Sequence, residues 1–136
     1  MNSRLSAILI VLVVCGSITA QEKSPRFLGK DLATWREQLR SADAQDRHTA
    51  AWTLAQLGKS ADDALQQALR HDDPVVRFWA AHGLGKRTIG PETISLLTAL
   101  RMALADPAPA VRIEAAARLA QQNHLDESLP VLIAAL

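Results

Sequence analysis

The sequence predicts an all-α fold, a superhelix of stacked helical hairpins, and three observations lead to it. A related frame of residues occurs around Arg47, Arg77 and Arg112, and each copy carries two adjacent alanines followed by a leucine. These small and apolar residues recur at helical spacing, so each frame is expected to bury them on one face. No stretch shows the alternation of apolar and polar residues that is typical of a strand. The chain is therefore expected to work by presenting a surface.

Residues 1–20 have the pattern of a signal peptide. Arg4 supplies the positive charge, residues 5–14 are apolar, and we expect cleavage after Ala20. The mature protein would then be exported to the periplasm or the cell exterior. Two alternatives stay open. One is acylation of Cys15, which the bulky residues before it disfavour, and the other is an uncleaved membrane anchor, although the apolar run is shorter than the ~20 residues of a spanning helix.

The charge balance of the mature chain is neutral. The full chain has 15 basic and 14 acidic residues, and removing residues 1–20 takes away one arginine and the single cysteine, which leaves 14 of each sign. A neutral chain argues against a nucleic-acid binder or a polybasic membrane binder. Without cysteine, neither a disulfide nor a thiolate metal site is available. We expect one domain that is held together by its core alone.

The first helical hairpin is expected after a short lead-in segment, residues 21–30. Phe27 and Leu28 of the lead-in are expected to cover the open end of this hairpin. Asp31 begins the first helix, because its side chain can cap the free amides of the first turn. The apolar stripe of that helix consists of Leu32, Trp35 and Leu39. Residues 44–57 form the second helix of the pair.

Two more hairpins follow, and proline marks the start of several of their helices. The second hairpin is predicted at 60–71 and from Pro74 to about Arg87, where Asp73 and Pro74 are a capping residue and a first helical residue. The third begins at Pro91 and ends with a helix over 109–122. The inward residues of the frame helices are expected to be Val76, Val111, the alanine pairs, Leu54, Leu84 and Leu119.

A last helix is predicted from Asp126, and it has no partner helix after it. Its inward residues are expected to be Leu129, Leu132, Ile133 and Leu136. Helical repeat arrays usually close with a polar cap, whereas this segment is apolar. We therefore expect either a shortened array or a helix that docks against a further repeat or a partner.

The motifs Asp-Pro, Val-Arg, Ala-Ala and Leu-Gly resemble HEAT repeats, in particular the short HEAT-like type first associated with phycobilisome lyases. The resemblance covers residues 31–136, as about three and a half hairpins. The copies are spaced 30 and then 35 residues apart, from Arg47 to Arg77 to Arg112, which is shorter than the roughly 40–47 residues of standard HEAT units. The chain is also similar, more weakly, to the HEAT-type extension behind exported bacterial sulfatases, but it lacks that enzyme's nucleophile motif, Cys/Ser-x-Pro-x-Arg.

The HEAT resemblance implies a structural ladder. In that family the arginine of the Val-Arg pair bonds aspartates in the turns of neighbouring repeats. The matching residues here are Arg47, Arg77, Arg112, Asp43 and Asp73. The resemblance also implies that the Val-Arg helices line the concave side of the superhelix.

On that concave side, the residues one, two, five and six positions after each arginine are expected to point out of the core. They are His48, Thr49, Trp52, Thr53, Phe78, Trp79, His82, Gly83, Ile113, Glu114, Ala117 and Arg118. Aromatic residues on a groove-facing strip are typical of binding surfaces, so Trp52, Trp79 and His82 are the leading contacts, with His48, Phe78 and Arg118 beside them. The alternative is that the rings fill space between helices; it stays open for Trp79 and is favoured for Phe78.

No catalytic, metal or cofactor site is expected. The four histidines, His48, His71, His82 and His124, are not at ligand spacing. Glu114 and Arg118 are expected to form a weak surface ion pair. The predicted function is a non-enzymatic exported module that binds a protein or peptide. The alternative is an accessory or detached segment of an exported enzyme, associated with a sulfatase or another hydrolase or handling a chromophore as the lyases do.

Overall fold

The computed structural model describes residues 26–88, 90 and 93–136. The predicted signal peptide, the first half of the lead-in segment (21–25) and Pro91 lie outside these residues.

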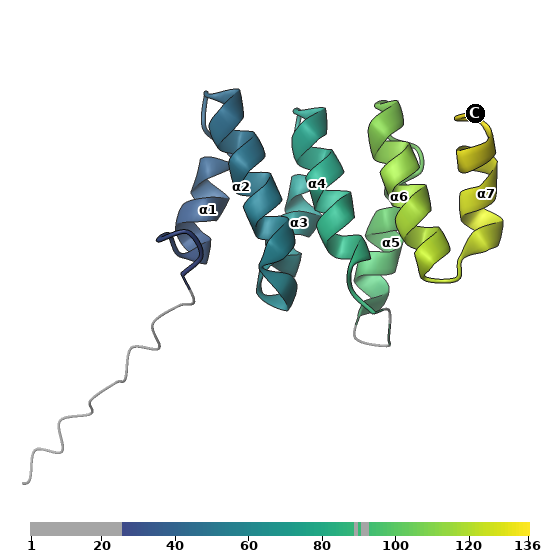
Figure 1. The fold of residues 1–136 in the computed structure, drawn as a ribbon, viewed down its shortest axis with the longest axis horizontal. Coiled ribbons are helices and arrows are strands. Elements are labelled where there is room, and N and C mark those ends of the chain that lie inside the picture. The colour runs from purple at the N-terminus through teal and green to yellow at the C-terminus, as the bar shows by residue number, and fades with distance from the viewer. Residues whose placement is uncertain (1–25, 89, 91–92) are drawn as a thin grey trace, which may run out of the picture.

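The described chain folds into three helical hairpins and a final helix, as predicted (Figure 1). The elements are α1 (Leu32–Gln38), α2 (Ala44–Gln56), the 3-10 turn η1 (Gly58–Ala61), α3 (Asp62–Ala68), α4 (Pro74–Gly85), α5 (Ile94–Ala103), α6 (Pro109–Gln121) and α7 (Leu125–Ile133). Within the described ranges the only β pairing is an isolated bridge between Phe27 and Lys30. The all-α class and the superhelix of hairpins are therefore confirmed, and none of these helices is long and apolar enough to cross a membrane.

The hairpins stack in two layers. Helices α2, α4 and α6 stand side by side in front, with α1, α3 and α5 behind them (Figure 1). In the front layer α2 packs on α4 and α4 on α6, whereas in the rear layer α1 and α3 hardly touch. This closer packing agrees with the concave side that the HEAT resemblance assigns to the Val-Arg helices. We call α2, α4 and α6 the inner layer and α1, α3 and α5 the outer layer.

The core is built from small residues on the inner helices and leucines between the layers. The predicted inward valines, alanine pairs and leucines of the frame helices are all buried. At Gly83 an added Cβ would lie 2.8 Å from the Cα atom of Ala55, so α2 and α4 can approach this closely only because residue 83 has no side chain.

Two residues that were expected to point out of the core, Thr53 and Gly83, are buried. That expectation is wrong because the sixth position after the frame arginine faces a neighbouring repeat. Gly83 meets Ala55 of α2, and the equivalent Arg118 packs against Gly85 of α4. The position thus belongs to the contact between repeats.

The helix starts follow the predicted capping residues. Asp31, Asp43 and Asp73 each accept a hydrogen bond from an amide in the first turn of α1, α2 and α4. The second hairpin starts differently from the prediction, since the segment after α2 first forms η1, which begins at Gly58 with a φ of +73°. Helix α3 is shorter than the predicted 60–71 as a result.

Helix α7 presents most of its apolar residues to solvent, so the inward direction expected for Leu129, Ile133 and Leu136 is wrong, whereas Leu132 is half-buried. Leu129, Ile133 and Leu136 are exposed, and Ser128 is the buried residue of this helix. The reason is that α7 packs against α6 on one side only. Ser128 lies in that contact with Leu132 one turn later on the same face, whereas Leu125, Leu129 and Ile133 form an exposed stripe.

The lead-in segment covers the first hairpin through one of its two predicted residues. The ring of Phe27 lies 6.5 Å from the ring of Trp52, and Trp35 Nε1 donates a 3.0 Å hydrogen bond to the carbonyl oxygen of Phe27. Lys30 Nζ stands 4.7 Å from the Trp35 ring. Leu28 is 65% exposed and covers nothing.

Candidate functional site

An aromatic cluster stands on α4 in the inner layer. The Trp79 ring centre is 5.4 Å from that of Phe78 and 5.3 Å from that of His82, in edge-to-face geometry, and Phe78 and His82 are stacked at 6.4 Å. His82 lies three and four residues after Trp79 and Phe78, and these two spacings place its ring beside both of theirs on the helix surface. We call Phe78, Trp79 and His82 the α4 cluster. Each ring is half-buried, so each has one packed and one accessible side.

The packed sides of the α4 cluster serve the fold. Trp79 packs against the main core, whereas Phe78 packs against a smaller group made by Ala103, Val111 and Ala115. The filler role that was favoured for Phe78 agrees with this position. Both rings are held by these contacts, so the side that faces solvent has a fixed orientation.

Trp52 stands on α2 and is 39% exposed, more than any other tryptophan of the described chain. It occupies the position of the frame that His82 occupies on α4. Its aromatic contact is Phe27 of the lead-in segment. The inner layer therefore carries two aromatic groups, Trp52 on α2 and the α4 cluster.

A charged network joins α4 to α6 beside the aromatic cluster. Glu114 Oε1 lies 2.6 Å from Arg118 Nε and 2.8 Å from His82 Nδ1, and Arg118 Nη2 lies 2.9 Å from the same Nδ1. One ring nitrogen cannot both donate and accept, so we assign Nδ1–H as donor to the carboxylate, the stronger acceptor. All three side chains are largely buried. The surface ion pair expected for Glu114 and Arg118 is instead a packed link between repeats, and a Cβ on Gly85 would overlap the Arg118 side chain.

One rung of the ladder joins the first and second hairpins. Arg47 Nη2 and Nε donate to Asp73 Oδ2 at 3.0 and 3.3 Å, and Arg47 Nη1 donates to the carbonyl oxygens of Ser41 and Ala42, both at 2.9 Å. His48 Nε2 lies 2.9 Å from the same Asp73 oxygen. His48 is therefore held in this rung by its contact with Asp73.

A second rung joins the second and third hairpins through a residue that the sequence analysis missed. Arg77 Nε and Nη2 donate to the two oxygens of Asp106 at 2.8 and 3.0 Å. Asp106 Oδ1 also accepts from the Ala108 amide at 2.8 Å. Asp43 and Asp73 stand four residues before Arg47 and Arg77, and the residue four before Arg112 is Ala108. The Asp-Pro pair two residues earlier was the signal that could have found Asp106.

The remaining predicted ladder residues lack a charged partner in the described chain. Arg112 Nη1 donates to the carbonyl oxygens of Asp106 and Pro107 at 2.8 and 3.1 Å, in its own turn. Asp43 caps α2 by accepting from the Gln45 amide at 2.7 Å. Among the described residues, no carboxylate bonds Arg112 and no arginine bonds Asp43.

The ladder lowers the pKa of both of its aspartates. Burial alone would raise the pKa of Asp73, but hydrogen bonds from His48, the Val75 amide and Arg47 outweigh it and lower the pKa from 3.8 to about 2. Burial likewise opposes the shift at Asp106, where the hydrogen bonds from Arg77 and the Ala108 amide lower the pKa. Both carboxylates are thus ionised wherever the protein is near neutral pH.

The described residues contain no group of three or more histidines, cysteines and carboxylates that could hold a metal ion. The two remaining histidines make other contacts. His71 hydrogen-bonds to the carbonyl oxygen of Leu39, and His124 lies 3.7 Å from Glu127. The candidate site is the surface formed by Trp52 and the α4 cluster on the inner layer.

Comparison with known proteins agrees with this architecture. A family model described as HEAT repeats matches residues 32–103, more than half of the 136-residue chain. The match runs from α1 to α5, and α6 carries the third copy of the same frame. No curated protein matches the chain. With paired helices, two ladder rungs and a family match over more than half its length, the chain belongs to the HEAT repeat family.

Proposed function

We propose that this protein is an exported, non-enzymatic scaffold module that binds a protein or peptide along its inner layer. HEAT repeats generally mediate protein–protein interactions, and the family typically serves as a scaffold. The observation that carries the proposal is the pair of aromatic groups on the inner layer, Trp52 and the α4 cluster. Export rests on the signal-peptide pattern of residues 1–20.

The aromatic groups suit a binding role because they are accessible and held in place. Binding hot spots are enriched in tryptophan, and a ring that is already oriented loses little entropy when a partner binds. Trp52 is exposed, and Trp79 is fixed by its contacts with Phe78 and His82. These two tryptophans are the proposed anchors.

His82 is the proposed polar contact. Its Nδ1 is used by Glu114, whereas its Nε2 makes no hydrogen bond to the described residues. In the assigned tautomer Nε2 carries a lone pair, so it can accept a hydrogen bond from an amide or hydroxyl of the partner. His48 and Arg118 support this surface through the ladder and the charged network, and Phe78 supports it by packing.

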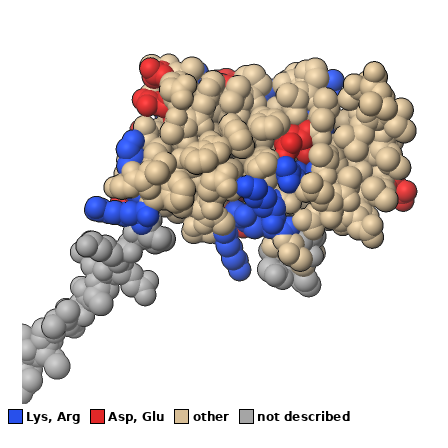
Figure 2. All heavy atoms as spheres, in the orientation of Figure 1, with Lys and Arg blue, Asp and Glu red and all other residues tan. Residues whose placement is uncertain are grey.

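The distribution of charge on the inner layer suits a partner whose contacting part is uncharged. Figure 2 shows the inner layer in front, where the middle of the face is mainly uncharged and most of the blue Lys and Arg atoms lie along its lower edge. A partner with apolar and hydrogen-bonding groups fits that region better than a polyanion does. The neutral net charge of the mature chain supports the same conclusion against nucleic acid.

The test is capture of partners from an exported fraction by the mature chain and three variants. Trp52→Ala and Trp79→Ala are the site variants, and Met102→Ala is the control, because Met102 is 66% exposed on α5 of the outer layer. Loss of a hot-spot tryptophan weakens binding by about tenfold or more. We expect one partner to be retained by the parent and the control and lost by both site variants. Equal retention by folded Trp52→Ala and Trp79→Ala chains would remove the inner layer as the binding site.

The second candidate is an accessory segment of an exported enzyme, and the exposed stripe of α7 favours it. Leu125, Leu129 and Ile133 follow one another at every fourth position and are all exposed. A further repeat or an enzyme domain that covers this stripe would shield it from water. A Leu129→Ser, Ile133→Ser chain should then lose an enzyme partner that Trp52→Ala retains, whereas retention by both chains would argue against this candidate.

A further inference from the structure

We propose that the outer layer holds a second binding site, a groove between α1 and α3 that takes an acidic segment of a partner protein. This site lies on the layer opposite to the α4 cluster, so it stands independently of the function proposed for the inner layer.

The groove exists because α1 and α3 are short and hardly touch, while the inner helices behind them pack closely. It has a volume of about 580 Å³. Its floor is apolar and consists of Leu39, Ala64 and Ala68, which are buried. The two alanines leave space where larger side chains would fill the gap between the helices. A floor of this kind accommodates an apolar side chain of a ligand.

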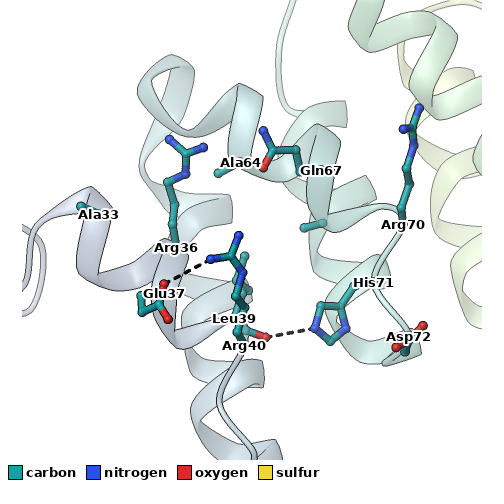
Figure 3. A pocket seen from close by; sticks show the side chains of 11 residues that line it. Ala33, Arg36, Glu37, Leu39, Arg40, Ala64, Gln67, Arg70, His71 and Asp72 are labelled. Atoms are coloured by element: carbon teal, nitrogen blue, oxygen red, sulfur yellow. Dashed lines mark hydrogen bonds and ion pairs between the residues drawn. The ribbon is translucent and has the colours of Figure 1, made fainter.

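The rim of the groove carries more positive than negative charge. Three arginines line it, Arg36, Arg40 and Arg70, against two carboxylates, Glu37 and Asp72. In Figure 3 Arg36 and Arg40 stand on one wall of the groove and Arg70 on the other; Glu37 is joined to Arg40 by its ion pair, and Asp72 lies apart from the three guanidinium groups. The rim therefore presents a net positive charge to a ligand.

Two of these arginines have no partner of their own. Arg40 lies 3.3 Å from Glu37 in a strongly exposed pair, which contributes little. Arg36 and Arg70 form no ion pair with any described residue, whereas Arg47, Arg77, Arg87, Arg101 and Arg118 each do. Arginine binds carboxylates through a planar fork of donors, so an acidic ligand would satisfy groups that the fold leaves free.

A histidine fixes the shape of the groove. His71 Nδ1 accepts a 2.9 Å hydrogen bond from the Asp73 amide, which places the ring proton on Nε2, and Nε2 donates to the Leu39 carbonyl oxygen at 3.0 Å. This link joins the end of α1 to the turn before α4 across one end of the groove (Figure 3). The groove is thus formed before a ligand arrives, and this lowers the entropic cost of binding.

The occupant that fits is a peptide segment in which acidic residues flank a medium-sized apolar residue. Its carboxylates reach Arg36 and Arg70 on the two walls, and the apolar side chain covers the alanine floor. The neighbouring groove between α3 and α5 shares Arg70 but has no second free arginine in its lining, which includes Ser95, Thr98 and Met102. Its one carboxylate, Asp106, is already bound by Arg77. Of these two grooves, the first combines an apolar floor with free arginines on both walls.

The test is fluorescence anisotropy with a fluorescein-labelled peptide of alternating Glu and Leu residues. The full chain is compared with an Arg36→Gln, Arg70→Gln variant. The control is a Lys59→Gln, Lys86→Gln variant, which loses the same charge at two exposed residues that do not line the groove. A peptide with Gln in place of Glu and a labelled oligothymidine are titrated in parallel.

We expect the acidic peptide to bind with a micromolar Kd, to bind about tenfold more weakly to the arginine variant, and to bind the lysine control like the parent. Binding should weaken as salt is raised, because the rim charges are exposed. Three results would overturn the proposal: no binding of the acidic peptide, equal loss in the arginine and lysine variants, or equal binding of the Gln peptide. Oligothymidine binding as tight as that of the peptide would also overturn it, since a general polyanion surface would explain both.

Discussion

The ladder predicts a large difference between two aspartates that look alike in the sequence. Asp43 and Asp73 both precede a frame helix and both cap it with a side-chain oxygen. Asp73 also bonds Arg47 and His48 of the preceding hairpin, and its side chain is 12% exposed. Asp43 is exposed and has no arginine partner in the described chain. Changing each one to alanine therefore separates the cap from the ladder.

The expected magnitudes follow from these contacts. Asp43→Ala removes a cap and should cost about 1 kcal/mol of the free energy of unfolding. Asp73→Ala removes a cap of the same kind and, in addition, the charged hydrogen bonds to Arg47, which contribute about 2 kcal/mol more. The pKa of Asp73, about 2 against an ordinary value of 3.8, gives a value of the same order, about 2 kcal/mol, for the net effect of burial, His48, the Val75 amide and Arg47 on the carboxylate. The total for Asp73→Ala is about 3 kcal/mol.

Urea unfolding followed by circular dichroism measures both losses. With an unchanged m value, the Asp73→Ala loss should be about three times the Asp43→Ala loss, which corresponds to a fall in Tm of about 12 °C against about 4 °C for a domain of this size. Equal losses for the two variants would refute the reasoning, because they would mean that the Arg47–Asp73 rung contributes nothing beyond the cap.

Three further predictions concern stability. The parent should have a larger free energy of unfolding than Asp73→Asn, and this difference should be constant above pH 3.8 and decline as the pH falls toward about 2, because the pKa of Asp73 is lower in the folded state than in the unfolded state. Urea titrations across this pH range measure the difference, and a difference that grows on acidification would contradict the prediction. Thr53→Val should raise the free energy of unfolding by about 1 kcal/mol, since the buried Thr53 hydroxyl has no partner among the described residues; a loss in the same assay would point to a missed hydrogen bond. Gly83→Ala should lower Tm, at a cost of about 2 kcal/mol, because the new Cβ would press on Ala55 and Leu65; an unchanged Tm would mean that the α2–α4 contact is loose.

The helices and their buried faces could be predicted because their signals are local. Paired alanines, a following leucine and an aspartate at the start of the helix recur in each frame, and each signal depends on neighbours within a few turns of the same helix. The burial of Leu54, Leu84 and Leu119 follows from that spacing alone. The number of hairpins then follows from the number of frames.

The features that were missed depend on contacts between repeats. Asp106 bonds Arg77 because the loop after α5 brings the two residues together. An alignment of the frames does not show the path of that loop. His71 bonds a carbonyl 32 residues earlier. The orientation of α7 depends on which of its sides meets α6, and an apolar sequence does not distinguish a packed side from an exposed one. Thr53 and Gly83 were misplaced for the same reason.

The layer on which the candidate residues lie could be predicted, but their contacts could not. The sequence placed Trp52, Trp79 and His82 on one layer, and they lie there. The sequence also predicted His48 and Arg118 as contacts for a partner. In the structure His48 bonds Asp73 in the ladder, and Arg118 bonds Glu114 in the charged network. A pattern of residues on one helix cannot show that a neighbouring helix supplies their partners.

Photo-crosslinking tests the proposed use of the inner layer most directly. A benzoylphenylalanine residue is placed at Trp52 in one chain and at Met102 in another, so that exposed positions on the inner and outer layers are compared. After irradiation of cells, the account predicts one dominant crosslinked protein from position 52 that is absent from position 102. Crosslinks to that protein from position 102 with none from position 52 would contradict the account.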